Sequence, residues 1–453
     1  MKSLFKQKKM SADKVLVMGF ALIILFGAML LNLPHATMQH KSIGFLKALF
    51  TATSATSVTG LVVVDTATTF NLFGRMVIIT LIQVGGLGFM MFGTFIFILL
   101  GKRISLKNRM LMADSFNSDS LSGIVRLYRR GFFIALSIES IGALLLCLRF
   151  IPMYGFKKGI GFSVFHAISA FCNAGFDLFG NFDSITSFHN DPLVIFTTAI
   201  LIVLGGLGFI VIDDVLTKKW NFKKFSLHSK IVLLSTAFLI TTGTILLMIT
   251  EYFNPLLWKE NTGFLNKLMN MFFQSVTLRT AGFTSVQVRD ISESGKLMSC
   301  IWMFIGTSPA STGGGVKTTT MFLLLLQTWA VIKGQEDLNI FNKKIYKKQS
   351  GKAVATVMIM FSAAVVSSWF VGIFEGSVRF AFLDIFYETI SAMTTVGLSS
   401  LSTPALTQQS TAILILIMFL GRVGPLTLAY ALGNHGQDFP SKIQYPEERI
   451  LIG

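Results

Sequence analysis

Four short segments of this 453-residue chain carry residue types that could replace the hydration shell of a cation. Each segment starts with phenylalanine, continues to a serine, and reaches a glycine after five or six intervening residues: Gly60, Gly175, Gly282 or Gly397. Glycine takes a positive φ without steric cost, which lets successive backbone carbonyls turn the same way. Inward-facing carbonyls coordinate dehydrated ions in channel filters. The segments therefore predict an ion-coordinating site made of backbone.

The register of these glycines strengthens the interpretation, because they lie 115, 107 and 115 residues apart. Any one alone could be a helix-packing glycine, since small residues are common where membrane helices meet. Four in register favour a filter. We expect a short helix over about residues 46–56, with the negative end of its dipole toward the ion. The candidate filter residues are Thr59, Gly60, Asn173, Ala174, Gly175, Thr280, Ala281, Gly282, Thr395, Val396 and Gly397.

A second candidate site is the stretch GTSPASTGGGVK, which interrupts an apolar run. Its four glycines and one proline cannot remain helical in lipid, so it should line water or protein. We interpret it as a flexible gate across the pore, with a plain kink as the alternative. Arg422 lies in the corresponding region of the last apolar run, and should face a cavity or a partner acid. The candidate gate residues are Gly306, Thr307, Ser308, Pro309, Ala310, Ser311, Thr312, Gly313, Gly314, Gly315, Lys317 and Arg422.

Eight apolar runs are predicted to position these sites, because about 20 apolar residues cross a hydrocarbon core as helix. The glycine motif GGLGF at 85–89 recurs at 205–209, and GRVGP stands at 421–425; we interpret it as close helix packing or a bend. Seven runs are continuous and the eighth contains the interruption. They cover residues 15–33, 76–100, 132–148, 193–216, 231–249, 353–374 and 411–432, with the interrupted run at 297–332.

The repeated pattern predicts an all-α integral membrane fold of four parallel helix, pore loop, helix units around a pseudo-fourfold pore. Two spans in each unit return the chain to the same side, so every copy has the same orientation. Inverted repeats would instead suit an alternating-access carrier, which stays the less favoured alternative. The predicted units are residues 1–125, 126–225, 226–345 with the interrupted second helix, and 346–453 with the C-terminal tail.

Composition and charge agree with a membrane location. Of all residues 52% are hydrophobic and 13% charged, and the mean hydropathy is +0.66, outside the range of soluble domains. The net charge of +17 resides largely in the N-terminal tail, residues 102–130, 218–230 and 333–352, and the C-terminal tail. By the positive-inside rule these segments are cytoplasmic, so both termini are inside and the number of spans is even. This distribution argues against a nucleic-acid partner.

Enzymatic chemistry is not indicated. Glu139, Glu251, Glu375 and Glu388 form no repeating pair, the histidines are isolated, and GGGVKT at 313–318 lacks the preceding glycine of a phosphate-binding loop. The three cysteines are widely spaced in apolar contexts and support neither a disulfide framework nor a zinc site. We expect no catalytic residues, no tightly bound cofactor, and a small cation in transit through the filter as the only metal ion.

The loops ending TSVTG, FCNAG, LRTAG and TTVG, the break at 306–317, Arg422 and the C-terminal YPEERILIG resemble the TrkH, KtrB and plant HKT superfamily, most of all its KtrB-type membrane subunits. The resemblance covers essentially the whole chain. It implies the filter role for the four glycines, a gate loop at 306–317, and a cavity arginine at Arg422 that stabilises the closed state. In sodium-selective plant relatives serine replaces the first filter glycine, so Gly60 implies potassium selectivity.

The same resemblance implies how the protein works and with what. It implies potassium uptake, possibly sodium-stimulated, through a homodimer with one pore in each subunit. It also implies a cytoplasmic ring of nucleotide-binding RCK subunits of the KtrA or KtrC kind, which would carry the nucleotide and control the gate. The expected location is the cell membrane of a bacterium, with a multi-pass topology. A sodium or non-selective cation transporter of the same superfamily is the alternative function.

Overall fold

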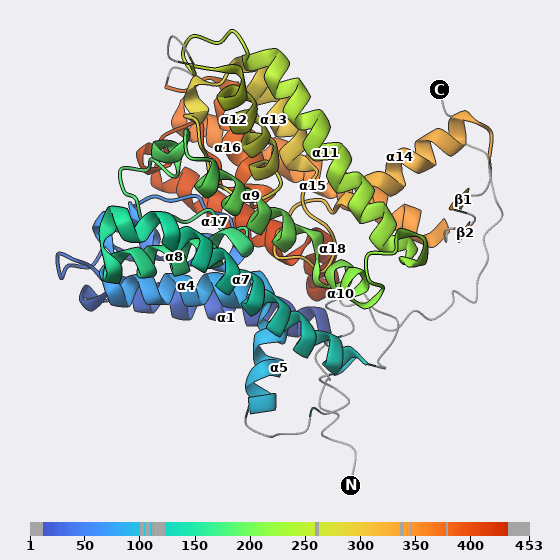
Figure 1. Cartoon of the computed structure of the whole chain (residues 1–453), viewed down its shortest axis with the longest axis horizontal. Coiled ribbons are helices and arrows are strands. Elements are labelled where there is room, and N and C mark those ends of the chain that lie inside the picture. Colours follow the sequence, from blue (N-terminus) through green and yellow to red (C-terminus); the bar gives the residue numbers. More distant parts are fainter. Residues whose placement is uncertain are drawn as a thin grey trace.

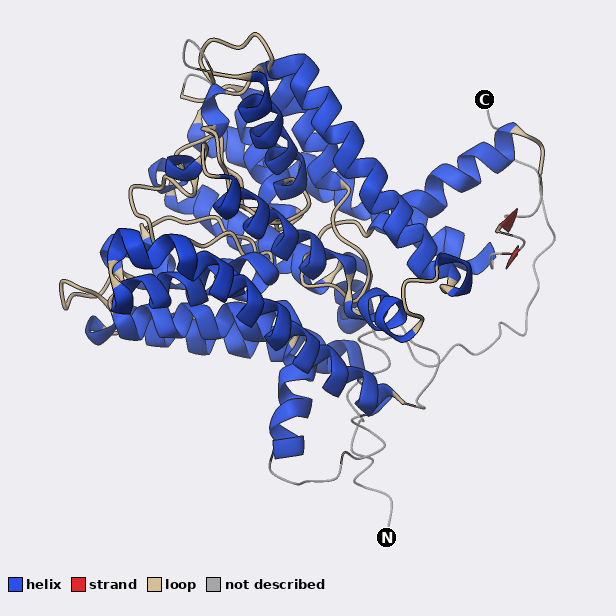
Figure 2. Ribbon diagram, viewed as in Figure 1, coloured by secondary structure: helices blue, strands red, loops and turns tan. Residues whose placement is uncertain are grey.

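The computed structural model describes residues 12–99, 104, 109–110, 112, 123–258, 262–335, 339–341, 343–344, 347–376 and 379–433. The basic N-terminal tail up to residue 11, much of the basic segment 102–130, and the C-terminal YPEERILIG lie outside these residues. The described chain is mostly helical (Figure 2). Its only strands are the two-residue β1 (Asn339–Ile340) and β2 (Lys343–Lys344), which pair antiparallel.

Four long helices are apolar enough to cross a membrane by length and composition within the described residues. They are α1 (Ala12–Asn32), α7 (Ile124–Tyr154), α11 (Leu227–Glu251) and α15 (Lys347–Glu375). Two bent pairs of helices raise this number to six. The eight predicted spans, the unit boundaries and the arrangement around a pore therefore stay predictions.

A short helix follows each long one and lies deep in the molecule. These helices are α2 (Phe45–Ser57), α8 (Phe156–Phe171), α12 (Phe264–Thr277) and α16 (Phe382–Met393). The helix expected over about 46–56 is thus confirmed as α2. At the end of each, one residue takes a left-handed conformation: Val58, Asn173, Thr280 and Thr395 have φ between 55° and 62°. That turn redirects the chain into the glycine segments.

The helices that follow are all broken; the sequence predicted an interruption in the third and, at the glycine motif of the others, close helix packing or a bend. They are α4 (Leu72–Leu87) with α5 (Phe89–Leu99), α9 (Pro192–Leu207) with α10 (Phe209–Thr217), α13 (Glu293–Phe304) with α14 (Thr318–Ile332), and α17 (Gln408–Val423) with α18 (Pro425–Leu432). The α9–α10 and α17–α18 pairs each bend by 95°. Gly88, Gly208 and Gly424 stand at the breaks with φ of 83° to 90°. The continuous spans 76–100, 193–216 and 411–432 were therefore wrong in continuity.

The repeated glycine motif serves both packing and bending, as the sequence predicted. A Cβ on Gly85, Gly205 or Gly421 would collide with the backbone carbonyl of Thr56, Phe171 or Met393, respectively. Each of those carbonyls lies at or next to the end of a short helix. Only glycine permits the broken helices to approach so closely.

Short elements connect the helices. They are α3 (Thr66–Thr69) and the 3₁₀ turns η1 (Pro34–Ala36), η2 (Thr186–Phe188), η3 (Phe222–Lys224), η4 (Val288–Asp290) and η5 (Thr403–Ala405). Figure 1 shows α9 and α17 in the middle, while α14 projects from the main body. Helix α17 also packs against α2, so the last quarter of the chain contacts the first.

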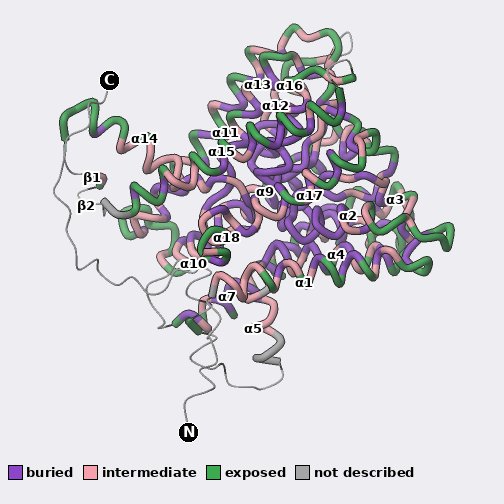
Figure 3. Tube along the Cα trace, turned by 180° about the vertical axis from the view of Figure 1, so that it is seen from behind, coloured by how far each residue is buried: buried purple, intermediate pink, exposed green. Residues whose placement is uncertain are grey.

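Burial differs from that of a soluble protein in two ways: polar residues share the deepest core with apolar ones, and the exterior is apolar. The tube in Figure 3 is purple in the middle of the molecule, and the deepest residues include hydroxylated ones such as Ser54, Thr59 and Thr395, all 0% exposed. Large apolar side chains cover the outside instead, among them Leu144, Ile249 and Leu22, which are 60% or more exposed. A polar centre within an apolar exterior is the arrangement expected of a protein in lipid.

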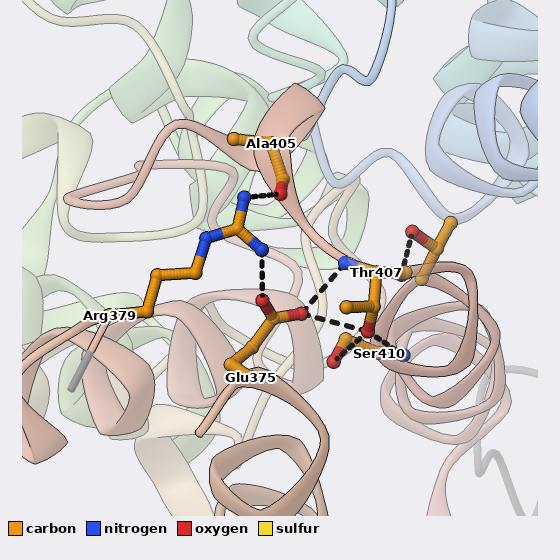
Figure 4. Close-up of polar contacts among 6 residues, drawn as sticks. Glu375, Arg379, Ala405, Thr407 and Ser410 are labelled. Carbon is orange, nitrogen blue, oxygen red and sulfur yellow. Dashed lines mark hydrogen bonds and ion pairs between the residues drawn. The ribbon is translucent and has the colours of Figure 1, made fainter. Parts of the chain in front are cut away.

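Polar contacts join the end of each of three long helices to the first residues of the following broken helix. Glu375 accepts hydrogen bonds from the Thr407 N–H (2.7 Å) and hydroxyl (2.9 Å) and pairs with Arg379 at 2.9 Å (Figure 4). Glu251 likewise accepts from the Ser292 N–H and hydroxyl. Arg149 pairs with Asp191 at 2.5 Å. Because Thr407, Ser292 and Asp191 cap α17, α13 and α9, these contacts hold one end of each broken helix.

Candidate functional site

The four glycines singled out in the sequence lie side by side. Gly60, Gly175, Gly282 and Gly397 have φ of 95°, 69°, 77° and 89°, the left-handed region that disfavours side chains. A Cβ on Gly60 would lie 3.2 Å from the Cα of Gly175, and one on Gly175 would lie 2.8 Å from the Cα of Gly282. A Cβ on Gly397 would lie 2.9 Å from the Cα of Gly60. The first loop therefore meets both the second and the fourth.

The residue before each glycine turns its carbonyl toward a neighbouring glycine. A Cβ on Gly60 would lie 2.6 Å from the Ala174 oxygen, and one on Gly175 would lie 2.9 Å from the Ala281 oxygen. A Cβ on Gly282 would likewise contact the Val396 oxygen, and a Cβ on Gly397 would contact the Thr59 oxygen. Four segments more than 100 residues apart thus contribute four backbone oxygens to one small region. Such oxygens suit a monovalent cation that has lost its water.

Hydroxyl groups hold these loops, a role that the sequence showed only as a shared serine. The Ser54 and Ser391 hydroxyls accept from the N–H groups of Gly60 (3.1 Å) and Gly397 (3.0 Å). In the second loop Ser169 donates to the carbonyl of Phe176 at 2.7 Å. In the third loop Thr277 donates to the Phe283 carbonyl at 2.5 Å, whereas Ser275, the serine of the shared pattern, donates to Ile240 of α11. The backbone is thereby held in place without side chains entering the ring.

An open cavity of about 360 Å³ adjoins the four glycines on one side. Three carboxylates line it, from Asp65, Asp177 and Asp183, together with Arg289. Burial raises the pKa of the Asp177 carboxyl, in the loop between α8 and α9, to about 6. Fixed negative charge in a narrow mouth raises the local concentration of cations. These acids were not among the residues singled out from the sequence, although Asp177 stands only two residues after Gly175.

The predicted gate stretch lies against the other side of the loops. A Cβ on Gly313 would collide with the Thr280 hydroxyl, and one on Gly314 with the Thr395 hydroxyl. Gly315 would place its Cβ 3.3 Å from the Thr394 carbonyl. Residues 306–317, named the gate loop from here on, thus cover the residues that precede two of the ring glycines.

The gate loop closes on itself and docks on the α9–α10 break. The Gly306 N–H donates to Val316 at 2.9 Å, and the Thr318 N–H donates to Thr307 at 3.1 Å. The Ser311 hydroxyl donates to the Ser308 carbonyl at 2.6 Å and lies 2.9 Å from the Thr307 hydroxyl. The Ser308 N–H donates to Gly206, and Ala310 accepts from Phe209; a Cβ on Gly208 would lie 2.6 Å from the Pro309 oxygen. These bonds hold the gate loop against the break between α9 and α10.

The two basic side chains predicted to belong to the gate, Arg422 and Lys317, bind backbone carbonyls. Arg422 donates to the Thr312 carbonyl of the gate loop through Nη1, and to Gly85 and Gly86 of α4 through Nη2. Lys317 donates to the Gly313 carbonyl at 2.8 Å. Neither forms an ion pair with a carboxylate in the part of the chain that the structure describes. Arg422 therefore ties the gate loop to a neighbouring helix without neutralising its charge.

A further buried contact lies behind the second loop. The Gln83 amide donates to both carboxylate oxygens of Glu139, at 3.1 and 3.0 Å, and the Cys172 thiol lies 3.5 Å from the Gln83 oxygen. Glu139, which belongs to no repeating pair in the sequence, is thus bound by an amide from α4. This contact supports the end of α8, directly before the second loop.

Comparison with known proteins is consistent with this geometry. The TrkH family, described as cation transport protein, matches residues 5–439. The chain is 41% identical to the Ktr system potassium uptake protein B of Bacillus subtilis, over 99% of this chain and 98% of that protein. It is 39% identical to the potassium/sodium uptake protein NtpJ of Enterococcus hirae, over 99% and 98%. The potassium transporter TrkH of Vibrio parahaemolyticus has a similar fold, with a TM-score of 0.69, 18% identity, and 95% and 87% of the two chains covered.

A helical membrane protein in which four backbone carbonyls converge on one small region is the class that fold and site define. Within that class, the chain belongs to the TrkH family of cation transport proteins. The resemblance to KtrB-type subunits stated from the loop motifs is thereby confirmed. The family is one of transporters rather than enzymes.

Proposed function

We propose that this protein is a channel-like subunit for potassium uptake, in which the ion passes through the ring of Gly60, Gly175, Gly282 and Gly397. The observation that carries the proposal is the meeting of the four glycine loops, with four carbonyl oxygens between them. Thr59, Ala174, Ala281 and Val396 provide those oxygens. The filter extends to Asn173, Thr280 and Thr395, which open three of the loops.

Potassium is the proposed ion because two observations favour it. Relatives of similar length are named for potassium uptake, and Gly60 stands where sodium-selective plant relatives have serine. One relative is named for potassium and sodium, so a less selective monovalent cation transporter is the second candidate. Stimulation of uptake by sodium belongs to the same proposal.

The topology that we propose has eight spans in four parallel units, residues 1–125, 126–225, 226–345 and 346–453, around a pseudo-fourfold pore. Both termini face the cytoplasm of a bacterial cell. The recurring order of long, short and broken helices supports this arrangement, and so does the clustering of basic residues at alternate connections.

The gate loop is the proposed regulator of flow, because it covers the filter on the side opposite the acidic cavity. Arg422 holds it closed by its bond to Thr312. A homodimer under a cytoplasmic RCK ring of the KtrA or KtrC kind would open it, with the nucleotide bound on that ring. Relatives named as lettered proteins of a Ktr system support the existence of such partners.

The test is uptake of potassium, rubidium and sodium into proteoliposomes containing the purified protein, with and without an RCK subunit. Uptake of potassium well above that of sodium supports the proposal. Equal uptake of both ions would favour the non-selective alternative. Absence of any flux with the RCK subunit present would reject a channel-like function.

A further inference from the structure

The side chain of Asn173 stands between the second filter loop, the third filter loop and the gate loop. Its backbone has a φ of 58° and the residue is 0% exposed. Its Nδ2 lies 3.2 Å from the carbonyl of Arg279, in the third loop. Its Oδ1 lies 3.3 Å from the hydroxyl of Thr312, in the gate loop. The amide therefore joins three segments that are far apart in the sequence.

The orientation of this amide follows from its neighbours. A carbonyl oxygen only accepts hydrogen bonds, so the NH₂ group of Asn173 must face Arg279. The amide oxygen then faces Thr312, whose hydroxyl proton is shared between Asn173 and the Phe171 carbonyl, 3.1 Å away. The reverse orientation would bring two oxygen acceptors together at the Arg279 position.

Thr312 is the most firmly held residue of the gate loop. Its N–H donates to Gly205 of α9 at 3.3 Å, its carbonyl accepts from Arg422, and its hydroxyl contacts Phe171 and Asn173. The glycines that follow carry no side chains, and the carbonyls of Gly313 and Gly314 accept hydrogen bonds from Lys317 within the loop. Rotation about the ψ bond of Thr312 and the φ bond of Gly313 can therefore move the glycines while the Thr312 hydroxyl stays against the second filter loop.

We propose that Asn173 is a positioning residue which makes the selectivity of the filter depend on the gate loop. This inference rests on the proposed function of the two sites. Thr312 holds the amide, the amide holds the Arg279 carbonyl, and Arg279 directly precedes Thr280 in the third filter loop. The gate loop thus has two roles: its glycines obstruct the pore, and its Thr312 anchor supports the filter in both closed and conducting states. The Asn173 side chain ligates no ion.

The experiment compares potassium and sodium uptake into proteoliposomes for the wild type and four variants. These are Thr312→Val, Thr312→Ser, Asn173→Ala and the double variant that combines Thr312→Val with Asn173→Ala. The uptake ratio is independent of how many gates are open, so it separates support of the filter from gating. Loss of one net hydrogen bond of about 1 kcal/mol corresponds to about a fivefold fall in the ratio for Thr312→Val. Thr312→Ser keeps the hydroxyl and should keep the wild-type ratio. The double variant should fall no further than Asn173→Ala, because both changes break one chain of contacts.

Two control variants separate the possible failures. Ser311→Ala removes a gate-loop hydroxyl whose bonds remain within the loop, so the ratio should stay at the wild-type value even if total flux changes. Gly60→Ser alters the filter directly and should lower the ratio. A wild-type ratio in Thr312→Val, or additive effects in the double variant, would overturn the coupling while Gly60→Ser keeps the filter assignment. An unchanged ratio in Gly60→Ser would instead reject the filter itself. If Asn173→Ala does not fold, the valine and serine variants of Thr312 decide the question.

Discussion

Replacing Arg422 by alanine should raise cation flux in the absence of any regulatory subunit. The guanidinium bridges the Thr312 carbonyl of the gate loop and the Gly85 and Gly86 carbonyls of α4. Of the bonds that Arg422 makes, the one to the Thr312 carbonyl reaches the gate loop, so it is the Arg422 bond expected to differ between the closed and the open loop. A hydrogen bond from a charged donor contributes about 1.5–3 kcal/mol. Its loss should therefore shift the gate toward the open state by about 10- to 100-fold.

The assay for this prediction is rubidium uptake into proteoliposomes without an RCK subunit, normalised to the amount of folded protein. Arg422→Lys is the matched variant, because lysine keeps the positive charge but lacks the planar fork that reaches two acceptors. We expect a large rise for alanine and a smaller one for lysine. A rise for alanine alone, with lysine at the wild-type level, would mean that the charge itself obstructs cations and the bridge is secondary.

Unchanged or reduced flux in both Arg422 variants would refute the reasoning. It would show that the contact between Arg422 and Thr312 does not hold the loop closed. Deletion of the three glycines 313–315 gives an independent measurement, since it shortens the obstruction without touching Arg422. Raised flux in the deletion with wild-type flux in both arginine variants would assign the gate to the loop but not its closure to Arg422.

Three further predictions concern the filter, the scaffold and the outer cavity. Gly60→Ser should lower the ratio of potassium to sodium uptake by up to about tenfold. A side chain at φ 95° costs about 1–2 kcal/mol, and its Cβ would lie 2.6 Å from the Ala174 oxygen. An unchanged ratio in parallel uptake assays would count against the filter. Glu375→Gln should lower the midpoint of thermal unfolding in detergent by a few degrees, because an amide NH₂ would face Arg379 or Thr407; an equal midpoint would show that this contact does not stabilise the fold. Because burial raises the pKa of Asp177 to about 6, its carboxylate is charged at pH 7.5 and largely neutral at pH 5.5. Acidification should therefore raise the potassium concentration for half-maximal uptake by about two- to fivefold. Asp177→Asn should show the higher concentration at both pH values, and an identical pH response in the variant would assign the effect to another group.

Much of the site could be predicted from the sequence because its chemistry is local. A glycine that needs positive φ follows a short apolar helix at Gly397 just as it does at Gly60. Four copies of this pattern in register identify a repeated structural unit. Apolar runs of sufficient length likewise predict helices in lipid. The break at 306–317 was visible because three glycines and a proline cannot continue a helix.

The tertiary structure decided what these devices contact. Arg422 binds backbone carbonyls rather than an acid, and every residue has a carbonyl, so no residue type in the sequence could reveal its partners. The 95° bends arise where glycines let a broken helix pack against the end of a short helix, a long-range contact between residues that carry no sequence signature of each other.

The sequence by itself determined the membrane class, the four glycine loops and the position of the interrupted helix, because each depends on composition or local backbone preference. Only the tertiary structure brought the loops together, placed Asp177 at their mouth, and set Asn173 between the filter and the gate loop. The physical reason is that these contacts join groups more than 100 residues apart in the chain. Such long-range contacts are determined by how whole helices pack, which no single stretch of sequence encodes.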